Sequence, residues 1–424
     1  MIKRIKIYMA KKTDAAGGSI FDLVKSLNSD ADIIETAVWA NSDDYIGTGS
    51  YILNAAVSGS LFGGLPNRRS MMLAGESGAG KSYLAASMAR EAQKKGYTVI
   101  VLDSEGAWDK EFAGRIGVDT SKLIAVPVNV ISEVNTFLAN LCDKMAASKL
   151  KDKVFVILDS VGNLTSDKEK NDSTEGNQVR DMTKQQQLKA LFRVNGLKMS
   201  KLAIPFLIVN HVYAKIDFMG GVEVSGGQGL KYNPSITMIL TKAQLRDDKI
   251  GEKIVEQNKG KTDYTRTGVL VTATPFKSRF TRPVKVKFQI PFFKAPNPYV
   301  GLEQYLTWEN SGVMEGELLT EKDYDKLSDA EKSVVKTFEY NGQTMYARPK
   351  VAGIYKNRKI VVARLGQTLP ITELFTDKVF TDELLHKLDD EIIKPTFQLP
   401  SGQAQDDLDE FFTDDGGDIN GNNE

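Results

Sequence analysis

The residues best suited to chemistry form one short run, Gly75–Ser82, whose pattern GxxxxGKS lies between an apolar run and a helix-like run. Glycines let consecutive backbone N–H groups wrap around a polyphosphate without a Cβ in the way, at the positive end of a helix. The lysine then reaches the outer phosphates, and the serine hydroxyl binds Mg²⁺. The pattern predicts a nucleotide-binding loop, although an ordinary glycine-rich turn has the same composition. The predicted nucleotide contacts are Gly75, Glu76, Ser77, Gly78, Ala79, Gly80, Lys81, Ser82 and Tyr83.

Two carboxylates follow apolar, strand-like runs elsewhere in the chain, where they could serve that nucleotide. A nucleotide hydrolase needs a magnesium anchor and a carboxylate that positions the attacking water. Asp159 closes the run Val154–Leu158 and is predicted to bind the metal together with Ser82. Glu105 follows the first strand after the loop's helix and is the candidate for positioning water. From these residues alone, a surface acid at a strand end is the competing interpretation of Glu105.

The elements that must position these groups alternate between short β-rich runs and helical runs from about residue 46 to residue 300. This alternation predicts an α/β fold with a largely parallel central sheet and helices on its faces. Polar residues follow four of the predicted strands, and because the carboxyl ends of parallel strands share one edge, these residues should meet in one crevice. The predicted strands are Met71–Ala74, Thr98–Asp103, Leu123–Val126, Val154–Asp159, Phe206–Asn210, Thr237–Leu240, Gly268–Ala273 and Val284–Ile290.

Composition and charge describe a globular chain of 424 residues, 41% of them hydrophobic, with room for two or three domains. The 55 basic and 55 acidic residues balance, but eight of the acids lie from Asp406 onward, where no Lys or Arg occurs. The rest of the chain is therefore basic and suited to a polyanion. The single cysteine, Cys142, excludes an internal disulfide, and no apolar run is long enough to span a bilayer, so we expect a cytoplasmic protein.

Four regions are expected along the chain. The first contains apolar residues at helical spacing in a helix too short to form its own core, which predicts that it packs on another partner. These apolar residues are Ile20, Phe21, Val24 and Leu27. The expected regions are an N-terminal oligomerisation element (1–45), an ATPase core (46–300), a smaller mixed or helical domain (301–399) and a disordered acidic tail (400–424).

Six further runs occur in a characteristic order: Ile46-Gly47-Thr48-Gly49-Ser50, Gly63-Gly64-Leu65-Pro66, Asp103-Ser104-Glu105-Gly106-Ala107-Trp108-Asp109, Gly117-Val118-Asp119, Leu158-Asp159-Ser160-Val161 and Gly226-Gly227-Gln228-Gly229-Leu230-Lys231. Together with the glycine-rich loop they resemble the RecA-type strand-exchange recombinases, and among them the UvsX-like phage members most. The resemblance covers about Ile46 to Pro291. It implies a RecA-like P-loop NTPase core, ATP and Mg²⁺ as cofactors, and a DNA-dependent ATPase coupled to strand exchange. A phage-encoded member would act in the cytoplasm of the bacterial host.

The resemblance assigns roles around the nucleotide. It makes Glu105 the water-activating base and places Asp109 and Phe112 against the adenine, Phe112 by stacking, although a plain core role for Phe112 is about as well supported. It also makes His211 a sensor of the γ-phosphate, at a position where many family members have Gln. A strand-end histidine with only local hydrogen bonds is the alternative for His211.

Two basic residues, Lys277 and Arg279, resemble the pair that reaches into the neighbouring subunit's nucleotide, with a small gap in the spacing. A cation supplied in this way neutralises transition-state charge and makes hydrolysis depend on assembly. By composition alone, a solvated basic turn fits these residues equally well.

Two segments match the family's DNA-binding loops. The first runs from Asp167 to Lys189, with an ordinary solvated loop as the alternative. The second runs from Val212 to Lys231, where glycines allow close approach to a sugar-phosphate chain but also suit a lid. The candidate DNA contacts are Arg180, Lys184, Lys189, Gly220, Gly221, Gly226 and Gly227.

We therefore predict an ATP-dependent recombinase that forms helical filaments on single-stranded DNA, pairs that strand with a homologous duplex and exchanges strands. Its expected partners are both DNAs, further copies of itself, and single-strand-binding and mediator proteins, with no membrane. A ring helicase motor on the same core and a filament mediator that does not hydrolyse ATP are the alternatives. The acidic tail either competes with DNA for the basic part of the chain or serves only solubility.

Overall fold

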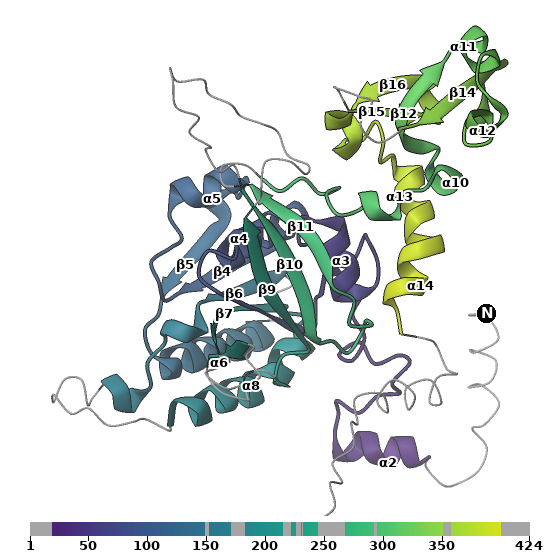
Figure 1. The fold of residues 1–424 in the computed structure, drawn as a ribbon. Coiled ribbons are helices and arrows are strands. Elements are labelled where there is room, and N and C mark those ends of the chain that lie inside the picture. Colours follow the sequence, from purple (N-terminus) through teal and green to yellow (C-terminus); the bar gives the residue numbers. More distant parts are fainter. Residues whose placement is uncertain are drawn as a thin grey trace, which may run out of the picture.

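The computed structural model of the chain describes residues 19–148, 152–170, 183–214, 222–225, 230, 232–244, 268–291, 295–350 and 358–399. These residues form a large central sheet covered by helices and a smaller second sheet (Figure 1). None of the helices within these ranges is long and apolar enough to cross a lipid bilayer.

The central sheet has nine strands in the order β11-β10-β9-β3-β7-β6-β4-β5, with β8 paired to β7 outside this path. The strands from β9 to β5 run parallel, whereas β10 is antiparallel to both of its neighbours. Every predicted strand is present, and the predicted largely parallel sheet is confirmed. The strands are β3 Ser70–Gly75, β4 Thr98–Asp103, β5 Leu123–Pro127, β6 Val154–Asp159, β7 Phe206–Ala214, β8 Val222–Val224, β9 Ile236–Gln244, β10 Gly268–Lys277 and β11 Val286–Pro291.

Three strands, β7, β9 and β10, continue four residues beyond the ends predicted for them, to Ala214, Gln244 and Lys277. The reason for β9 and β10 is their mutual pairing, in which Leu270 lies opposite Ala243 and Thr272 opposite Thr241. This antiparallel ladder provides hydrogen-bond partners for the backbone N–H and C=O groups of these residues, although their polar side chains do not continue the apolar run of a buried strand. The apolar run therefore predicted where these strands begin but not where they end.

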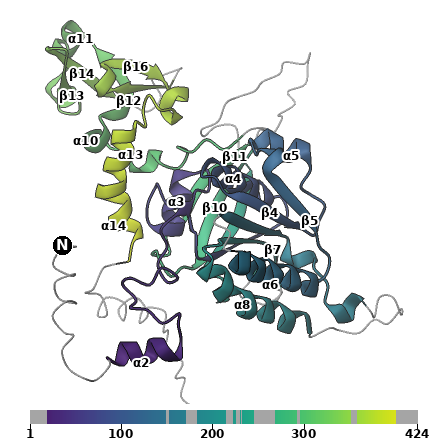
Figure 2. The same ribbon diagram turned by 180° about the vertical axis from the view of Figure 1, so that it is seen from behind.

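Helices cover both faces of the central sheet, because successive residues of a strand point to opposite faces. Met71 and Leu73 of β3 belong to the core beneath α3 and α4, whereas Met72 and Ala74 belong to the core beneath α6 and α8. Figures 1 and 2 show α6 and α8 together on one side of the sheet. The helices are α3 Tyr51–Ser58, α4 Lys81–Lys94, α5 Lys110–Ile116, α6 Ile131–Ser148 and α8 Thr183–Lys201.

A second sheet of five antiparallel strands lies apart from the central one, in the order β13-β14-β12-β15-β16 (Figure 1). Short helices accompany it, so this region combines both kinds of element. The boundaries expected at residues 300 and 399 stay predictions. The elements are α10 Trp308–Ser311, β12 Val313–Leu319, α11 Glu321–Asp325, α12 Asp329–Lys332, β13 Lys336–Tyr340, β14 Gln343–Pro349, β15 Lys359–Val362 and β16 Gln367–Pro370.

The chain returns from the second sheet through a helical segment that packs on the end of α3. The Asp389 carboxylate, 2% exposed, accepts a hydrogen bond from the Leu61 N–H at 2.6 Å. Farther on, Gln398 forms a bridge with Thr281 in the turn between β10 and β11. The last described residues therefore lie beside that turn. The segment consists of α13 Asp382–Leu388, the π-helical turn Asp389–Ile393 and α14 Lys394–Phe397.

The N-terminal helix α2, Ile20–Leu27, begins with a capping box between Ser19 and Asp22. None of its residues is buried, and Ile20 and Leu27 are 75% and 79% exposed. The helix predicted from the apolar spacing is therefore present, and its apolar side chains other than Phe21 are exposed. A separate two-stranded sheet is formed by β1 Tyr45–Ile46, before α3, and β2 Leu65–Pro66, after it.

Candidate nucleotide-binding and catalytic site

The glycine-rich run joins the end of β3 to the start of α4, at the carboxyl edge of the parallel strands. A Cβ at Gly75 would lie 2.7 Å from the Leu240 carbonyl oxygen, and one at Gly80 would lie 2.2 Å from Ile290 Cδ1. Gly80 also has a φ of 84°, which other residues rarely adopt. The loop therefore packs closely against β9 and β11 and leads into a helix N-terminus, whose first N–H groups have no partner within the helix.

The Lys81 side chain is hydrogen-bonded to the backbone of this loop. Its Nζ donates hydrogen bonds to the carbonyls of Gly75 and Glu76, each at 2.9 Å, and the residue is only 6% exposed. Burial lowers the pKa of the Lys81 amine, while the carboxylates of Asp159 and Glu105 oppose that shift. The loop thus holds a cation close to two carboxylates, and a lysine at this position of the loop can reach the phosphates of a bound nucleotide.

Asp159 ends β6 next to the loop and is 1% exposed. The Trp108 Nε1–H donates to its Oδ2 at 2.9 Å, and the Ser82 side chain is also hydrogen-bonded to the carboxylate. Its Oδ1 is buried without a hydrogen-bond partner in the described part of the chain. Burial raises the pKa of Asp159, and the charges of Glu105 and Asp103 raise it further against the hydrogen bonds. A divalent cation would stabilise this concentration of negative charge.

Glu105 lies in a tight turn directly after β4. The Asp103 carboxylate accepts the N–H groups of Glu105 and Gly106, each at 2.9 Å, which fixes the turn. Glu105 Oε1 accepts from Ser160 Oγ at 2.6 Å and lies 3.0 Å from His211 Nε2. Burial raises the pKa of Glu105, but these hydrogen bonds and the nearby positive charges lower it on balance. The carboxylate is therefore ionised and oriented, and it can accept a proton from water.

Asp109 and Phe112, predicted to contact the adenine, lie at the start of α5. The Asp109 carboxylate accepts the Phe112 N–H at 2.7 Å and so caps the helix. The Phe112 ring meets the Trp108 ring edge-to-face, with centroids 5.9 Å apart, and packs against the core. These contacts are those of a helix cap and a partly buried ring, and the adenine contacts stay predictions.

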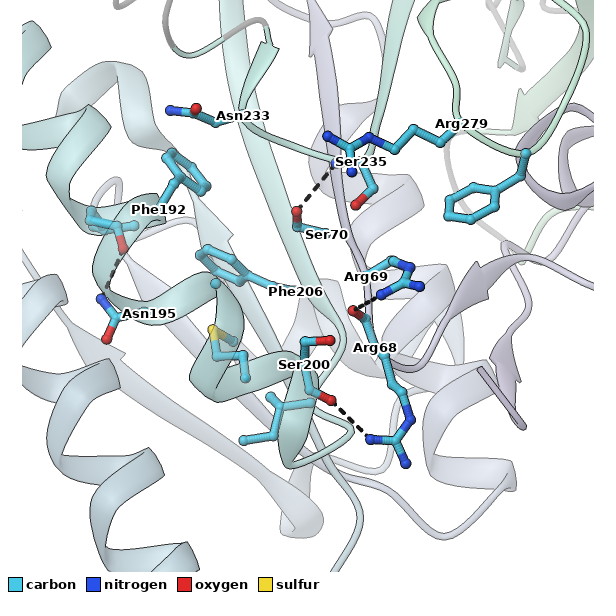
Figure 3. Close-up of a pocket in the computed structure, with 15 residues that line it drawn as sticks. Arg68, Arg69, Ser70, Phe192, Asn195, Ser200, Phe206, Asn233, Ser235 and Arg279 are labelled. Carbon is cyan, nitrogen blue, oxygen red and sulfur yellow. Dashed lines mark hydrogen bonds between the residues drawn. The ribbon is translucent and has the colours of Figure 1, made fainter. Parts of the chain in front are cut away.

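Lys277 and Arg279 lie at the opposite, amino edge of the sheet. Because β10 runs antiparallel to β9, Lys277 pairs with Thr237 near the start of β9. Its Nζ donates to the Pro234 carbonyl at 2.7 Å. Arg279 lines a separate pocket of about 310 Å³ (Figure 3). Within one chain neither residue meets Lys81 and Glu105, so the role predicted for this pair requires a second copy.

The candidate DNA contacts fall mostly outside the described residues: Arg180, Gly220, Gly221, Gly226 and Gly227. Lys184 and Lys189 lie on α8, and Lys189 is exposed. The Lys184 Nζ donates to the Gly162 carbonyl at 3.3 Å, which connects α8 to the segment after Asp159. The DNA-binding role of both lysines stays a prediction.

Four residues in contact with the site were not predicted to have a role. Asp103 and Ser160 are hydrogen-bonded to Glu105. The Trp108 indole is hydrogen-bonded to Asp159. The Lys242 Nζ on β9 donates to the Ser77 carbonyl at 2.6 Å. The strand-end position of Asp103 was a usable signal. Lys242 and Trp108 carried none, because their contacts join elements far apart in the sequence.

The fold and this cluster agree with the comparisons to known proteins. The RecA N-terminal domain family matches residues 32–280, more than half of the chain, and the chain therefore belongs to this family. The RecA-like core fold and the resemblance to RecA-type and phage recombinases, both predicted from the motifs, are confirmed.

The similarity to individual relatives is moderate. The chain is 30% identical over 209 residues to a recombination and repair protein of Enterobacteria phage T4, covering 49% of this chain and 52% of that protein. It is 32% identical over 240 residues to the protein RecA of Chlorobium limicola, covering 55% and 62%. It is 29% identical over 240 residues to the protein RecA of Mesoplasma florum, covering 55% and 66%. The chain thus spans about half to two thirds of the length of these relatives.

Proposed function

We propose that this chain is an ATP-dependent recombinase that forms helical filaments on single-stranded DNA and catalyses homologous pairing and strand exchange. The observation that carries the proposal is the cluster at the carboxyl edge, where Lys81, Asp159 and Glu105 surround the glycine-rich loop. Membership of the RecA family supports recombination as the process that this cluster serves.

The residues at this edge fit Mg-ATP. The loop and Lys81 would hold the phosphates, Ser82 and Asp159 the magnesium, and Asp109 and Phe112 the adenine. Asp159 has an unpartnered buried oxygen, and within the described ranges no group of three or more His, Cys, Asp or Glu side chains forms a metal cage. This suits a cation that takes most of its ligands from phosphate and water. Bound Mg-ATP would supply the phosphoanhydride to be cleaved and would neutralise charge on it.

The chain's own residues would orient the water and accept its proton. The hydrogen bonds found on Glu105 both reach Oε1, so Oε2 is the oxygen that would accept. Ser160 and His211 hold the carboxylate in one orientation, which supplies the geometry that general-base catalysis needs. His211 could give up its hydrogen bond to Glu105 and form one with a phosphate oxygen instead. Because His211 lies on β7, this change would connect hydrolysis to the strand that leads into the second DNA-binding segment.

A second copy of the chain would complete the site. Lys277 and Arg279 would reach the nucleotide of the neighbour from the amino edge and stabilise the charge that develops in the transition state. The exposed apolar side chains of α2 would pack on the neighbouring core. Contacts between two different surfaces of one chain generate open helical filaments when the rotation does not close.

DNA would be held mainly through its phosphates, by Lys184, Lys189 and the segments beyond them. Such binding has weak sequence preference and depends steeply on salt, with a slope of about −0.7 per phosphate neutralised on a single strand.

The test is strand exchange between a circular single strand and a homologous linear duplex, with ATP and Mg²⁺. We expect exchange by the wild type and none by Lys81→Ala, which removes the buried lysine. Lys94→Ala is the matched control, because Lys94 lies on the same helix with its side chain 62% exposed. Absence of exchange by the wild type contradicts the proposal. Electron micrographs of the same reaction separate open filaments from the closed rings of a helicase motor.

A further inference from the structure

The end of β9 extends past the carboxyl edge of the parallel strands and runs beside the glycine-rich loop. The last residue of β9 that pairs with β3 is Leu240, which lies opposite Gly75, the first residue of that loop. Beyond this point β9 continues as a partner of β10, as far as Gln244 opposite Val269. The antiparallel ladder therefore fixes the backbone of residues 241–244 next to the loop.

The Lys242 side chain of this extension contacts the loop. Its Nζ donates a hydrogen bond to the Ser77 carbonyl at 2.6 Å, and a Cβ added to Gly78 would lie 3.1 Å from the same nitrogen. Successive side chains of a strand alternate between the two faces of a sheet, so Lys242 lies on the same face as Leu240, which is buried in the core beneath α3 and α4. Lys242 is therefore directed toward the side of the sheet on which the loop leads into α4.

Two ammonium groups thus lie at one loop. Lys81 donates to the carbonyls of Gly75 and Glu76, and Lys242 donates to the next carbonyl, that of Ser77. Burial lowers the pKa of Lys81, and the charge of Lys242 lowers it as well, because like charges repel. Among the residues that the structure describes, no carboxylate forms an ion pair with Lys242. A polyphosphate would relieve this repulsion, since it brings several negative charges to the loop.

The hydrogen bond to Ser77 contributes little stability by itself, because Lys242 is exposed and water offers its ammonium group the same kind of partner. What the lysine adds is position and charge. It fixes the loop one residue before Gly78, whose φ of 72° lies in the region that favours glycine. It also brings a positive charge to the loop from a strand that is distant in the sequence.

We propose that Lys242 is a positioning residue for the nucleotide, which holds the loop through Ser77 and supplies a second positive charge beside Lys81 where the phosphates would bind. This inference rests on the proposed function, which assigns the loop to Mg-ATP. Mg-ATP carries one more negative charge than Mg-ADP, so a second cation stabilises the bound triphosphate more than the bound diphosphate. Lys242 therefore contributes to a preference for ATP over ADP.

Three variants of the full-length chain test this role. Lys242→Met removes the charge and the hydrogen bond but keeps an unbranched side chain, whereas Lys242→Arg keeps the charge. Lys94→Met is the matched control, because it removes one positive charge at the other end of α4, where the Lys94 side chain is 62% exposed. The measurements are equilibrium binding of Mg-ATP and Mg-ADP without DNA, and amide hydrogen exchange of residues 75–82 without nucleotide.

We expect Lys242→Met to weaken Mg-ATP binding by about tenfold, as for loss of one hydrogen bond to a charged group, and Mg-ADP binding by about threefold. Lys242→Arg and Lys94→Met should both stay within about threefold of the wild type for either nucleotide. In the nucleotide-free chain, the amides of the loop should exchange faster in Lys242→Met than in Lys94→Met, because the contact with Ser77 is lost.

A purely structural role would weaken both nucleotides equally and would not be rescued by Lys242→Arg, and this result would overturn the inference. Unchanged exchange of the loop amides in Lys242→Met would overturn it as well. Normal Mg-ATP affinity in Lys242→Met would overturn this inference alone. Nucleotide binding by the wild type without strand exchange would instead contradict the proposed function, so the two failures are distinguishable.

Discussion

The carboxyl and amino edges of the central sheet differ in whether their charged side chains lie beside side chains of opposite charge. At the carboxyl edge, Lys81 lies beside the carboxylates of Asp159 and Glu105, so opposite charges are already grouped. At the amino edge, Arg69 and Arg279 share a pocket whose lining contains no acid. A site preorganised for chemistry can be balanced within one chain, whereas a surface meant for another group keeps its charge uncompensated until that group arrives.

This contrast predicts that substitutions at the two edges impair different steps. A change at the carboxyl edge should impair metal binding or hydrolysis in every chain that carries it. A change at the amino edge should leave the isolated chain able to bind nucleotide and impair only what depends on assembly.

The largest effect is expected from Glu105→Gln, which keeps the shape of the side chain but removes the proton acceptor. ATP hydrolysis should fall by about 10²- to 10⁴-fold, the usual contribution of a general base. Nucleotide affinity, measured by equilibrium binding, should stay within a small factor of the wild type. Glu111→Gln is the control, as an exposed acid on α5. Near-normal hydrolysis in Glu105→Gln would remove this residue from the mechanism.

Arg279→Ala probes the other edge. DNA-stimulated ATP hydrolysis should fall by about 10²-fold, as for loss of one group that stabilises transition-state charge. Nucleotide binding by the unassembled chain should be unchanged. Arg282→Ala, an exposed arginine in the same turn, controls for a general loss of positive charge. If the unassembled chain lost nucleotide affinity as well, the separation between the two edges would be wrong.

Trp108→Phe removes the indole N–H that holds Asp159 Oδ2 and keeps an aromatic ring in the same place. Loss of such a partner behind a metal ligand typically costs about 10- to 100-fold in metal affinity. We therefore expect a higher Mg²⁺ concentration at half-saturation of nucleotide binding. Trp308→Phe, in the second sheet's region, should leave that midpoint in place. An unchanged midpoint in Trp108→Phe would show that Asp159 is positioned without the indole.

His211→Ala should have the smallest effect, a loss of about tenfold in DNA-stimulated hydrolysis at neutral pH, below the usual range for a full general base. The hydrogen bond and charge of His211 help to lower the pKa of Glu105. Without them that pKa rises, so the acid side of the pH–rate profile should move to higher pH. An unshifted profile with full DNA stimulation would contradict a sensor role.

Much of the fold could be predicted because it depends on local patterns. Strand β6 is a continuous apolar run that ends in Asp159, and the glycine-rich pattern identifies both the loop and the helix that follows it. The contact between Trp108 and Asp159 could not be predicted, because it depends on how β4 and β6 align in the folded sheet. The arginine pocket was missed for the same reason, since Arg68, Phe192 and Arg279 come together only through tertiary packing.

The attachment of the second sheet has a practical consequence for protein engineering. The chain leaves the core where the Tyr51 N–H at the start of α3 donates to the Pro298 carbonyl, and it returns where Asp389 binds Leu61 just past the end of the same helix. Both junctions are therefore fastened to one buried element. Val313, Ile360 and Val362 of the second sheet belong to the same apolar cluster as α3, so excising these strands and splicing in a brief connector would measure how much that shared packing contributes to the stability of the core.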